Sequence, residues 1–154
     1  MLPKYHILFG VLFTLSIYAI FPQTSLLYLA IIFLSSVLID GDHYLYYIFE
    51  KKDFNLLKAL KWYREKSKSF CSLSKNERKK VYSGLYLFHG IEWIIILAIL
   101  GKFFFPHLTY VSLGFLVHFA VDLPFEIYYK GTAHKSSLIY MFYLYLKNKK
   151  KVRK

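Results

Sequence analysis

The residues best able to do chemistry in this 154-residue chain are histidines and carboxylates that interrupt apolar segments. Five of the nine acidic residues and four of the six histidines lie inside or at the edge of such segments. They are His6, Asp40, Asp42, His43, His89, Glu92, His118, Asp122 and Glu126. Ionisable groups at membrane depth are costly unless they are paired or ligated, so we interpret this set as functional.

Local spacing places several of these groups together. His118 and Asp122 are four residues apart, and His89 and Glu92 are three apart, so each pair is predicted to share one helix face. The tetrapeptide at 40–43 gathers three candidate ligands around a glycine, which permits a tight turn.

Imidazole and carboxylate ligands without a thiolate suit zinc, manganese or iron, and favour a catalytic over a structural zinc site. The chain's one cysteine, Cys71, excludes a disulfide within the chain. We predict a divalent metal, zinc first, with manganese or iron as alternatives. The predicted ligands are His6, Asp40, Asp42, His43, His89, His118 and Asp122. Such a set is large enough for two metals, and Asp42 or Glu92 is the predicted general base.

Continuous apolar runs predict the elements that hold these groups. With 56% hydrophobic and 21% aromatic residues, the chain has more apolar surface than a domain of its size can bury, and a bilayer resolves the conflict. Each run has about 15–20 residues, near the length that crosses a membrane as a helix. The predicted spans are 5–21, 25–39, 81–100 and 108–125, and the second needs to continue past Asp40 to cross fully.

Short connections predict that these spans form two helical hairpins in a single all-α integral membrane domain, 1–154. Residues 22–25 make a turn and a helix cap, and residues 101–107 join the third span to the fourth. The polar segment 51–80 is predicted to hold an amphipathic helix around 54–62. Within the final stretch, 130–154, an aromatic run at 138–146 is predicted to lie in the membrane interface before a basic tail.

The basic residues predict the orientation. Residues 51–80 hold eleven of the 21 Lys and Arg residues, the stretch from Lys130 onward holds eight more, and the short connections hold only Lys102. The positive-inside rule places both termini and the 51–80 loop in the cytoplasm, in a multi-pass cytoplasmic-membrane protein. This topology, with attraction to anionic lipid headgroups, explains the net charge of +12 better than nucleic-acid binding does.

The order of these elements resembles the membrane-bound metal-dependent hydrolase family of inner-membrane proteins. The matching elements are His6, Asp-Gly-Asp-His at 40–43, His89, and Gly-x-x-x-His-x-x-x-Asp at 114–122. Family members typically carry His-Arg-Gly-x-Thr-His-Ser before the third helix, whereas residues 88–93 here read Phe-His-Gly-Ile-Glu-Trp. Because the family is itself similar to the zinc-dependent phospholipase C group, the resemblance implies a helical protein with clustered metals.

We therefore expect a metal-dependent hydrolase whose site opens at the cytoplasmic membrane interface and takes an amphiphilic ester or phosphoester, such as a phospholipid or lipid phosphate. Two alternatives stay open. A di-iron redox protein usually has Glu-x-x-His on two helices, and this chain has His-x-x-Glu once. A non-enzymatic scaffold or small metal or ion carrier would use the polar groups as a structural cluster. No motif predicts an oligomeric state.

Overall fold

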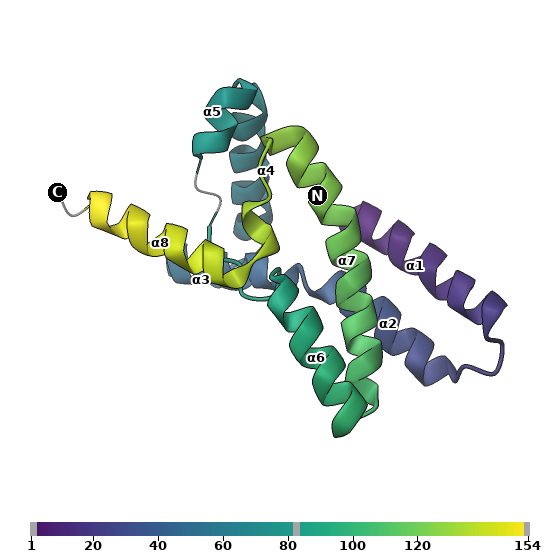
Figure 1. The fold of residues 1–154 in the computed structure, drawn as a ribbon. Helices are drawn as coiled ribbons and strands as arrows, with labels where there is room; N and C mark the ends of the chain where they lie inside the picture. Colours follow the sequence, from purple (N-terminus) through teal and green to yellow (C-terminus); the bar gives the residue numbers. More distant parts are fainter. Residues whose placement is uncertain (1–2, 82–83, 153–154) are drawn as a thin grey trace.

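The computed structural model describes residues 3–81 and 84–152, and within those ranges it is built from helices with no strand. Positions 82–83 of the predicted third span and 153–154 of the basic tail lie outside the described residues. Figure 1 shows the arrangement of the helices. In chain order they are α1 (Pro3–Ile20), α2 (Leu26–Leu38), α3 (Gly41–Lys51), α4 (Leu56–Ser72), α5 (Lys75–Lys80), α6 (Ile91–Phe103), α7 (His107–Lys130), the 3₁₀ turn η1 (His134–Ser136) and α8 (Leu138–Val152).

Two helical hairpins form the frame, α1 with α2 and α6 with α7 (Figure 1). The turn of the first hairpin follows the predicted pattern, because α1 ends before Pro22 and the Ser25 hydroxyl accepts a hydrogen bond from the Leu27 backbone N–H at 3.3 Å. The second hairpin turns at residues 104–106, just before α7 begins at His107.

Helix α7 lies at the centre and packs against α1, α2 and α6. Gly114 permits the close approach of α2, since a Cβ at this position would lie 2.5 Å from the Ile32 carbonyl oxygen. On the other side, the Ser112 hydroxyl donates to the Ile94 carbonyl of α6 at 2.9 Å. Both hairpins are therefore fixed to the same central helix.

Two helical stretches are long and apolar enough to cross a membrane by length and composition. They are the 26-residue stretch Leu26–Lys51, formed by α2 and α3 in succession, and the 24-residue α7. Helix therefore continues past Asp40, as the predicted second span required, with a turn at Ile39 and Asp40 between α2 and α3. At 18 and 13 residues, α1 and α6 are shorter, and a count of four spans stays a prediction.

The predicted third helix, 81–100, begins only at Ile91. The described residues before it, 84–90, form an irregular segment, in which Gly84 has a φ of +128° that side-chain-bearing residues rarely adopt. Gly90 is extended and caps α6. The prediction that His89 and Glu92 share one helix face was therefore wrong, because His89 lies in the loop before the helix.

Three further helices, α4, α5 and α8, lie outside the two hairpins. The predicted amphipathic helix at 54–62 is part of a longer helix, α4, and the predicted interfacial run at 138–146 lies within α8. The Arg78 guanidinium of α5 donates to the Tyr129 carbonyl at the end of α7, at 3.1 Å. Figure 1 shows α4 and α5 beside this end of α7, while α8 leads away from it towards the carboxyl terminus.

Candidate metal centre

All seven predicted metal ligands meet where the open ends of the two hairpins converge. They come from four separate parts of the fold: α1, the α2–α3 junction with the start of α3, the loop before α6, and α7. Six of the seven form two neighbouring groups of three, and each group has two histidines and one aspartate. Helix geometry explains the convergence, because each element delivers its polar residues at the same end of the frame.

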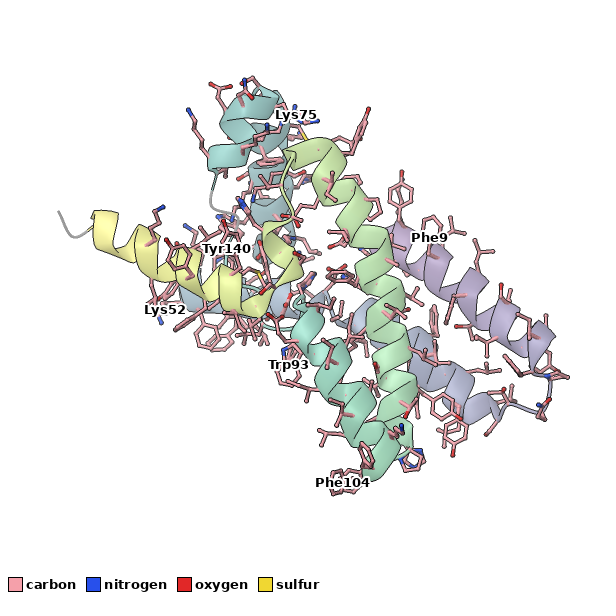
Figure 2. All side chains as sticks on the ribbon, in the orientation of Figure 1. Phe9, Lys52, Lys75, Trp93, Phe104 and Tyr140 are labelled. Carbon is pink, nitrogen blue, oxygen red and sulfur yellow. The ribbon has the colours of Figure 1, made fainter. Side chains whose placement is uncertain are left out.

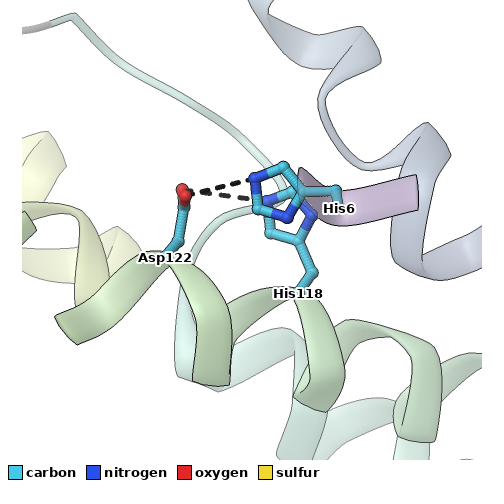
Figure 3. A group of neighbouring side chains, drawn as sticks. All are labelled: His6, His118 and Asp122. Atoms are coloured by element: carbon cyan, nitrogen blue, oxygen red, sulfur yellow. Dashed lines mark ion pairs between the residues drawn. The ribbon is translucent and has the colours of Figure 1, made fainter. Parts of the chain in front are cut away.

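The first group joins α1 to α7, as Figure 3 shows. Nε2 of His6 lies 3.2 Å from Oδ1 of Asp122, and Nε2 of His118 lies 3.8 Å from Oδ2 of the same carboxylate. The His6 and His118 rings stack with their centroids 3.9 Å apart, and both histidines are buried. One carboxylate thus faces two imidazoles that lie in nearly parallel planes.

The second group joins the α2–α3 junction to the loop before α6. Oδ1 of Asp40 lies 3.5 Å from Nε2 of His89 and 3.8 Å from Nε2 of His43. The His43 and His89 rings are also stacked, with their centroids 5.0 Å apart. This group therefore repeats the composition of the first: two imidazoles facing one carboxylate.

The two groups are in contact, and the two carboxylates lie between them. Nε2 of His89 is 3.3 Å from Nε2 of His118 and 3.7 Å from Oδ2 of Asp122, while Oδ2 of Asp40 is 3.8 Å from Nε2 of His6. Ligand atoms around a tetrahedral zinc ion at Zn–N of 2.0–2.1 Å are separated by about 3.3–3.4 Å. The spacing of the donor atoms is therefore close to that of a metal coordination sphere.

Three buried atoms of the cluster make no hydrogen bond of good geometry within the described residues. They are both ring nitrogens of His6 and Oδ1 of Asp40, although Nε2 of His6 lies 3.2 Å from Asp122 and Oδ1 of Asp40 lies 3.5 Å from His89 as ion pairs. Buried polar atoms are nearly always hydrogen-bonded, because an unsatisfied one retains its full desolvation cost. Ligation by a cation would satisfy Nε2 of His6 and Oδ1 of Asp40, so the residues present fit a metal.

Asp42 lies behind the histidines and orients two of them. Its Oδ1 accepts a hydrogen bond from Nδ1 of His43, and its Oδ2 accepts one from Nδ1 of His89, both at 3.0 Å. Oδ2 also accepts the Phe88 backbone N–H at 3.0 Å. These bonds leave Nε2 of both histidines facing Asp40, as in the carboxylate–histidine–metal arrangement of metalloproteins. Asp42, predicted as a ligand and a base, thus belongs to neither group of three and has both oxygens engaged.

Further hydrogen bonds fix the other side chains. Nδ1 of His118 donates to the Ser36 carbonyl of α2 at 2.8 Å, which again leaves Nε2 for the cluster. The Tyr63 hydroxyl of α4 donates to the His43 carbonyl at 2.7 Å. Burial raises the pKa of Tyr63, so its hydroxyl stays protonated as a donor. The Tyr86 ring packs against the His43 imidazole, with centroids 4.1 Å apart.

Within the described part of the chain, Glu92, the other predicted base, makes no hydrogen bond or ion pair with the seven clustered residues. Its carboxylate accepts hydrogen bonds from the Ser137 hydroxyl at 2.6 Å and from the backbone N–H groups of Leu138 and Ile139 at 2.9 and 3.2 Å. Glu92 therefore caps the start of α8, where a carboxylate also suits the helix dipole. Glu92 thus has a structural role as the cap of α8, and its role as a general base stays a prediction.

Glu126 and the two remaining histidines also lie outside the two groups of three. The Glu126 carboxylate accepts the Lys135 backbone N–H at 3.2 Å and so holds the turn after α7. His134 lies in that turn beside the Tyr140 ring. His107 lies at the opposite end of α7. Glu126 therefore holds the segment after α7 in place and does not orient a candidate metal ligand.

The chain matches no protein-family model, no curated protein and no solved structure.

Its buried histidines and aspartates could hold a metal ion, and an all-nitrogen-and-oxygen donor set suits zinc, manganese or iron.

A cavity of about 940 Å³ opens beside the cluster, between α4 and the carboxyl end of α7. Asp40, His43 and Asp122 form part of its wall, so the candidate metal centre is accessible from it. Lys135 also lines the cavity, with its Nζ 4.4 Å from the centre of the Tyr86 ring. Lys135 is a site residue that sequence reasoning missed, because it lies in a loop and no spacing pattern separates it from the other basic residues.

Proposed function

We propose that this chain is a membrane-embedded metal-dependent hydrolase that acts on an amphiphilic ester or phosphoester at the cytoplasmic interface. The observation that carries the proposal is the pair of two-histidine, one-aspartate groups beside an open cavity. The order of the histidines and aspartates along the chain, with its resemblance to membrane-bound metal-dependent hydrolases, supports the same class.

The membrane part of the proposal comprises four spans, two more than length and composition alone identify. Outward-facing apolar side chains on the two shorter helices support it. On α1, Phe9 and Leu15 are 43% and 58% exposed, and at the end of α6 Phe103 and Phe104 are each 68% exposed. Figure 2 shows Phe9 and Phe104 projecting away from the bundle. Lipid contact would explain this exposure, since water does not favour such surfaces.

The chemistry follows from how the chain holds its donors. When bound, a divalent metal lowers the pKa of water and polarises an ester or phosphoryl oxygen. His6, His118 and Asp122 would hold one ion, and Asp40, His43 and His89 a second. Because each carboxylate approaches histidines of both groups, two ions would lie close together, as two-metal phosphoesterases require.

Asp42 contributes by fixing histidine tautomers, so that Nε2 of His43 and of His89 is an acceptor directed at the cluster. The Ser36 carbonyl does the same for His118. A small cavity of about 20 Å³, lined by His89, His118 and Asp122, has room for one water molecule beside the donors. The chain therefore provides ligands, their orientation and a place for the nucleophile.

Elemental analysis of the detergent-purified protein tests the proposal, with wild type beside the double variant His118→Ala, Asp122→Ala. His107→Ala is the matched control, because it removes a histidine at the far end of α7. We expect one or more equivalents of zinc or manganese in wild type and control, and a loss in the double variant.

Hydrolysis of phosphoester and lipid substrates by the metal-loaded protein, absent in the double variant, is the second readout. Stoichiometric iron with a visible absorption band would indicate redox chemistry instead. Failure of wild type to retain or take up any metal would refute the proposal and favour a structural polar cluster.

A further inference from the structure

The wall of the 940 Å³ cavity is rich in positive charge beside the candidate metal centre. Its basic lining residues are Arg64, Lys66, Lys68, Lys130 and Lys135. Its acidic lining residues are Asp40, Asp122 and Glu126. Two of these acids belong to the metal centre, where a bound cation would offset their charge, and Glu126 accepts the Lys135 backbone N–H. The wall is therefore net positive, and it attracts an anion.

Two of these cations lie over aromatic rings. Lys135 lies over Tyr86, whose ring packs on the His43 imidazole of the metal centre. On α4, Nζ of Lys66 lies 4.8 Å from the centre of the Trp62 ring. Lys66 is half-buried, and this burial lowers the pKa of its ammonium group. An anion bound between these two lysines would replace part of the hydration that their ammonium groups lose on burial.

Most of the remaining wall is apolar, although Ser67, Ser69 and several tyrosines also line it, and the cavity is too large for a small ion alone. Side chains from α4, α7 and the connections on either side of α5 form this part: Leu56, Leu60, Phe70, Leu73, Val81 and Phe125. Cavities that enclose drug-sized organic ligands are about 300–1,000 Å³. A water-soluble phosphate would leave the apolar wall wet, whereas an acyl chain would cover it.

We propose that this cavity is the binding site of a lipid with a phosphate headgroup. The headgroup lies between Lys66 and Lys135, next to the metal centre, and the acyl chain lies along the apolar side chains of α4 and α7. The step from lipid binding to lipid hydrolysis rests on the proposed function. The inference names the substrate class as an anionic lipid phosphoester and not a neutral ester.

Binding measurements on the full chain in detergent test the inference. The probe is a single-chain lipid phosphate, 1-acyl-glycerol 3-phosphate, compared with the neutral monoacylglycerol of the same chain and with glycerol 3-phosphate. Each is titrated into metal-free and zinc-loaded protein. The test variant is Lys66→Gln with Lys135→Gln, and the control is Lys61→Gln with Lys102→Gln, which removes the same charge outside the cavity.

We expect the lipid phosphate to bind more tightly than either comparison ligand. We also expect binding to weaken by about tenfold or more in the test variant, since two charged contacts to the phosphate are lost, and the control variant to bind like wild type. Unchanged circular dichroism and metal content show that the test variant is folded. Equal binding of the neutral lipid, equal binding of glycerol 3-phosphate, or equal effects of the two variants would each overturn the inference.

The two proposals fail separately. Lysine-dependent binding of the lipid phosphate without metal retention or turnover would support the lipid site and refute the hydrolase. Metal-dependent turnover of a neutral ester, with no effect of the lysine variant, would support the hydrolase and refute the lipid site.

Discussion

Asp42→Asn separates a metal ligand from a residue that orients ligands. The carboxylate accepts from Nδ1 of both His43 and His89, one on each oxygen. An asparagine side chain has one oxygen, so one of these two imidazoles would lose its acceptor and face an amide N–H instead. Ligand-orienting partners of this kind typically change metal affinity by about 10–100-fold, which corresponds to roughly 1.4–2.7 kcal/mol.

We therefore expect Asp42→Asn to bind metal, but with about 10–100-fold lower affinity than wild type, measured by competition with a chromophoric chelator. Asp122→Asn, which alters a group facing the donors directly, should lose the metal at any practical concentration. Asp53→Asn is the control, because that carboxylate lies in the α3–α4 connection and hydrogen-bonds Tyr47 and Asn55. If Asp42→Asn were as deficient as Asp122→Asn, Asp42 would be a ligand; if it matched wild type, the orienting role would be refuted.

Two further predictions follow from the same contacts. Glu92→Gln should lower the free energy of unfolding by about 1–3 kcal/mol, since the charged cap of α8 is lost. The metal content should stay at the wild-type level. Loss of metal from a folded Glu92→Gln protein would instead support the catalytic role that the sequence predicts. Metal retention after dialysis should fall as the pH is lowered, because only neutral imidazole binds a metal and protonation removes the lone pair that would ligate it; retention that stays constant until the protein unfolds in acid would count against histidine ligation.

The sequence predicted the helical fold and the convergence of the seven clustered residues, for one physical reason. Polar groups inside apolar runs are rare, and hairpin connectivity brings the ends of alternate helices together, so their depth could be inferred from chain position. The start of the third helix could not be inferred in this way, because residues 85–88 are as apolar as the helix that follows. The break depends on Gly84 and its positive φ, which apolar periodicity does not reveal.

The roles of the three carboxylates in this region were also beyond sequence reasoning. Asp40 and Asp42 are two residues apart on either side of a helix start, and only the turn at 39–40 decides that Asp40 faces the donors while Asp42 lies behind them. Glu92 was assigned by its spacing from His89, and that spacing lost its meaning once His89 fell outside the helix. Residue type thus indicated a candidate metal centre, whereas the backbone decided which carboxylate faces the donor histidines, which orients them and which caps a helix.

His6 supports the proposal that the cluster binds a cation. Its side chain is fully buried on α1, and its Nδ1 has no hydrogen-bond partner among the described residues. A network selected for stability would satisfy this nitrogen, or would replace the imidazole by an apolar residue of similar size. Nε2 instead faces carboxylate oxygens of Asp122 at 3.2 Å and Asp40 at 3.8 Å, one from each group. A buried nitrogen without a partner and two carboxylates close together carry a desolvation cost, and a cation bound at Nε2 and these oxygens would offset part of it.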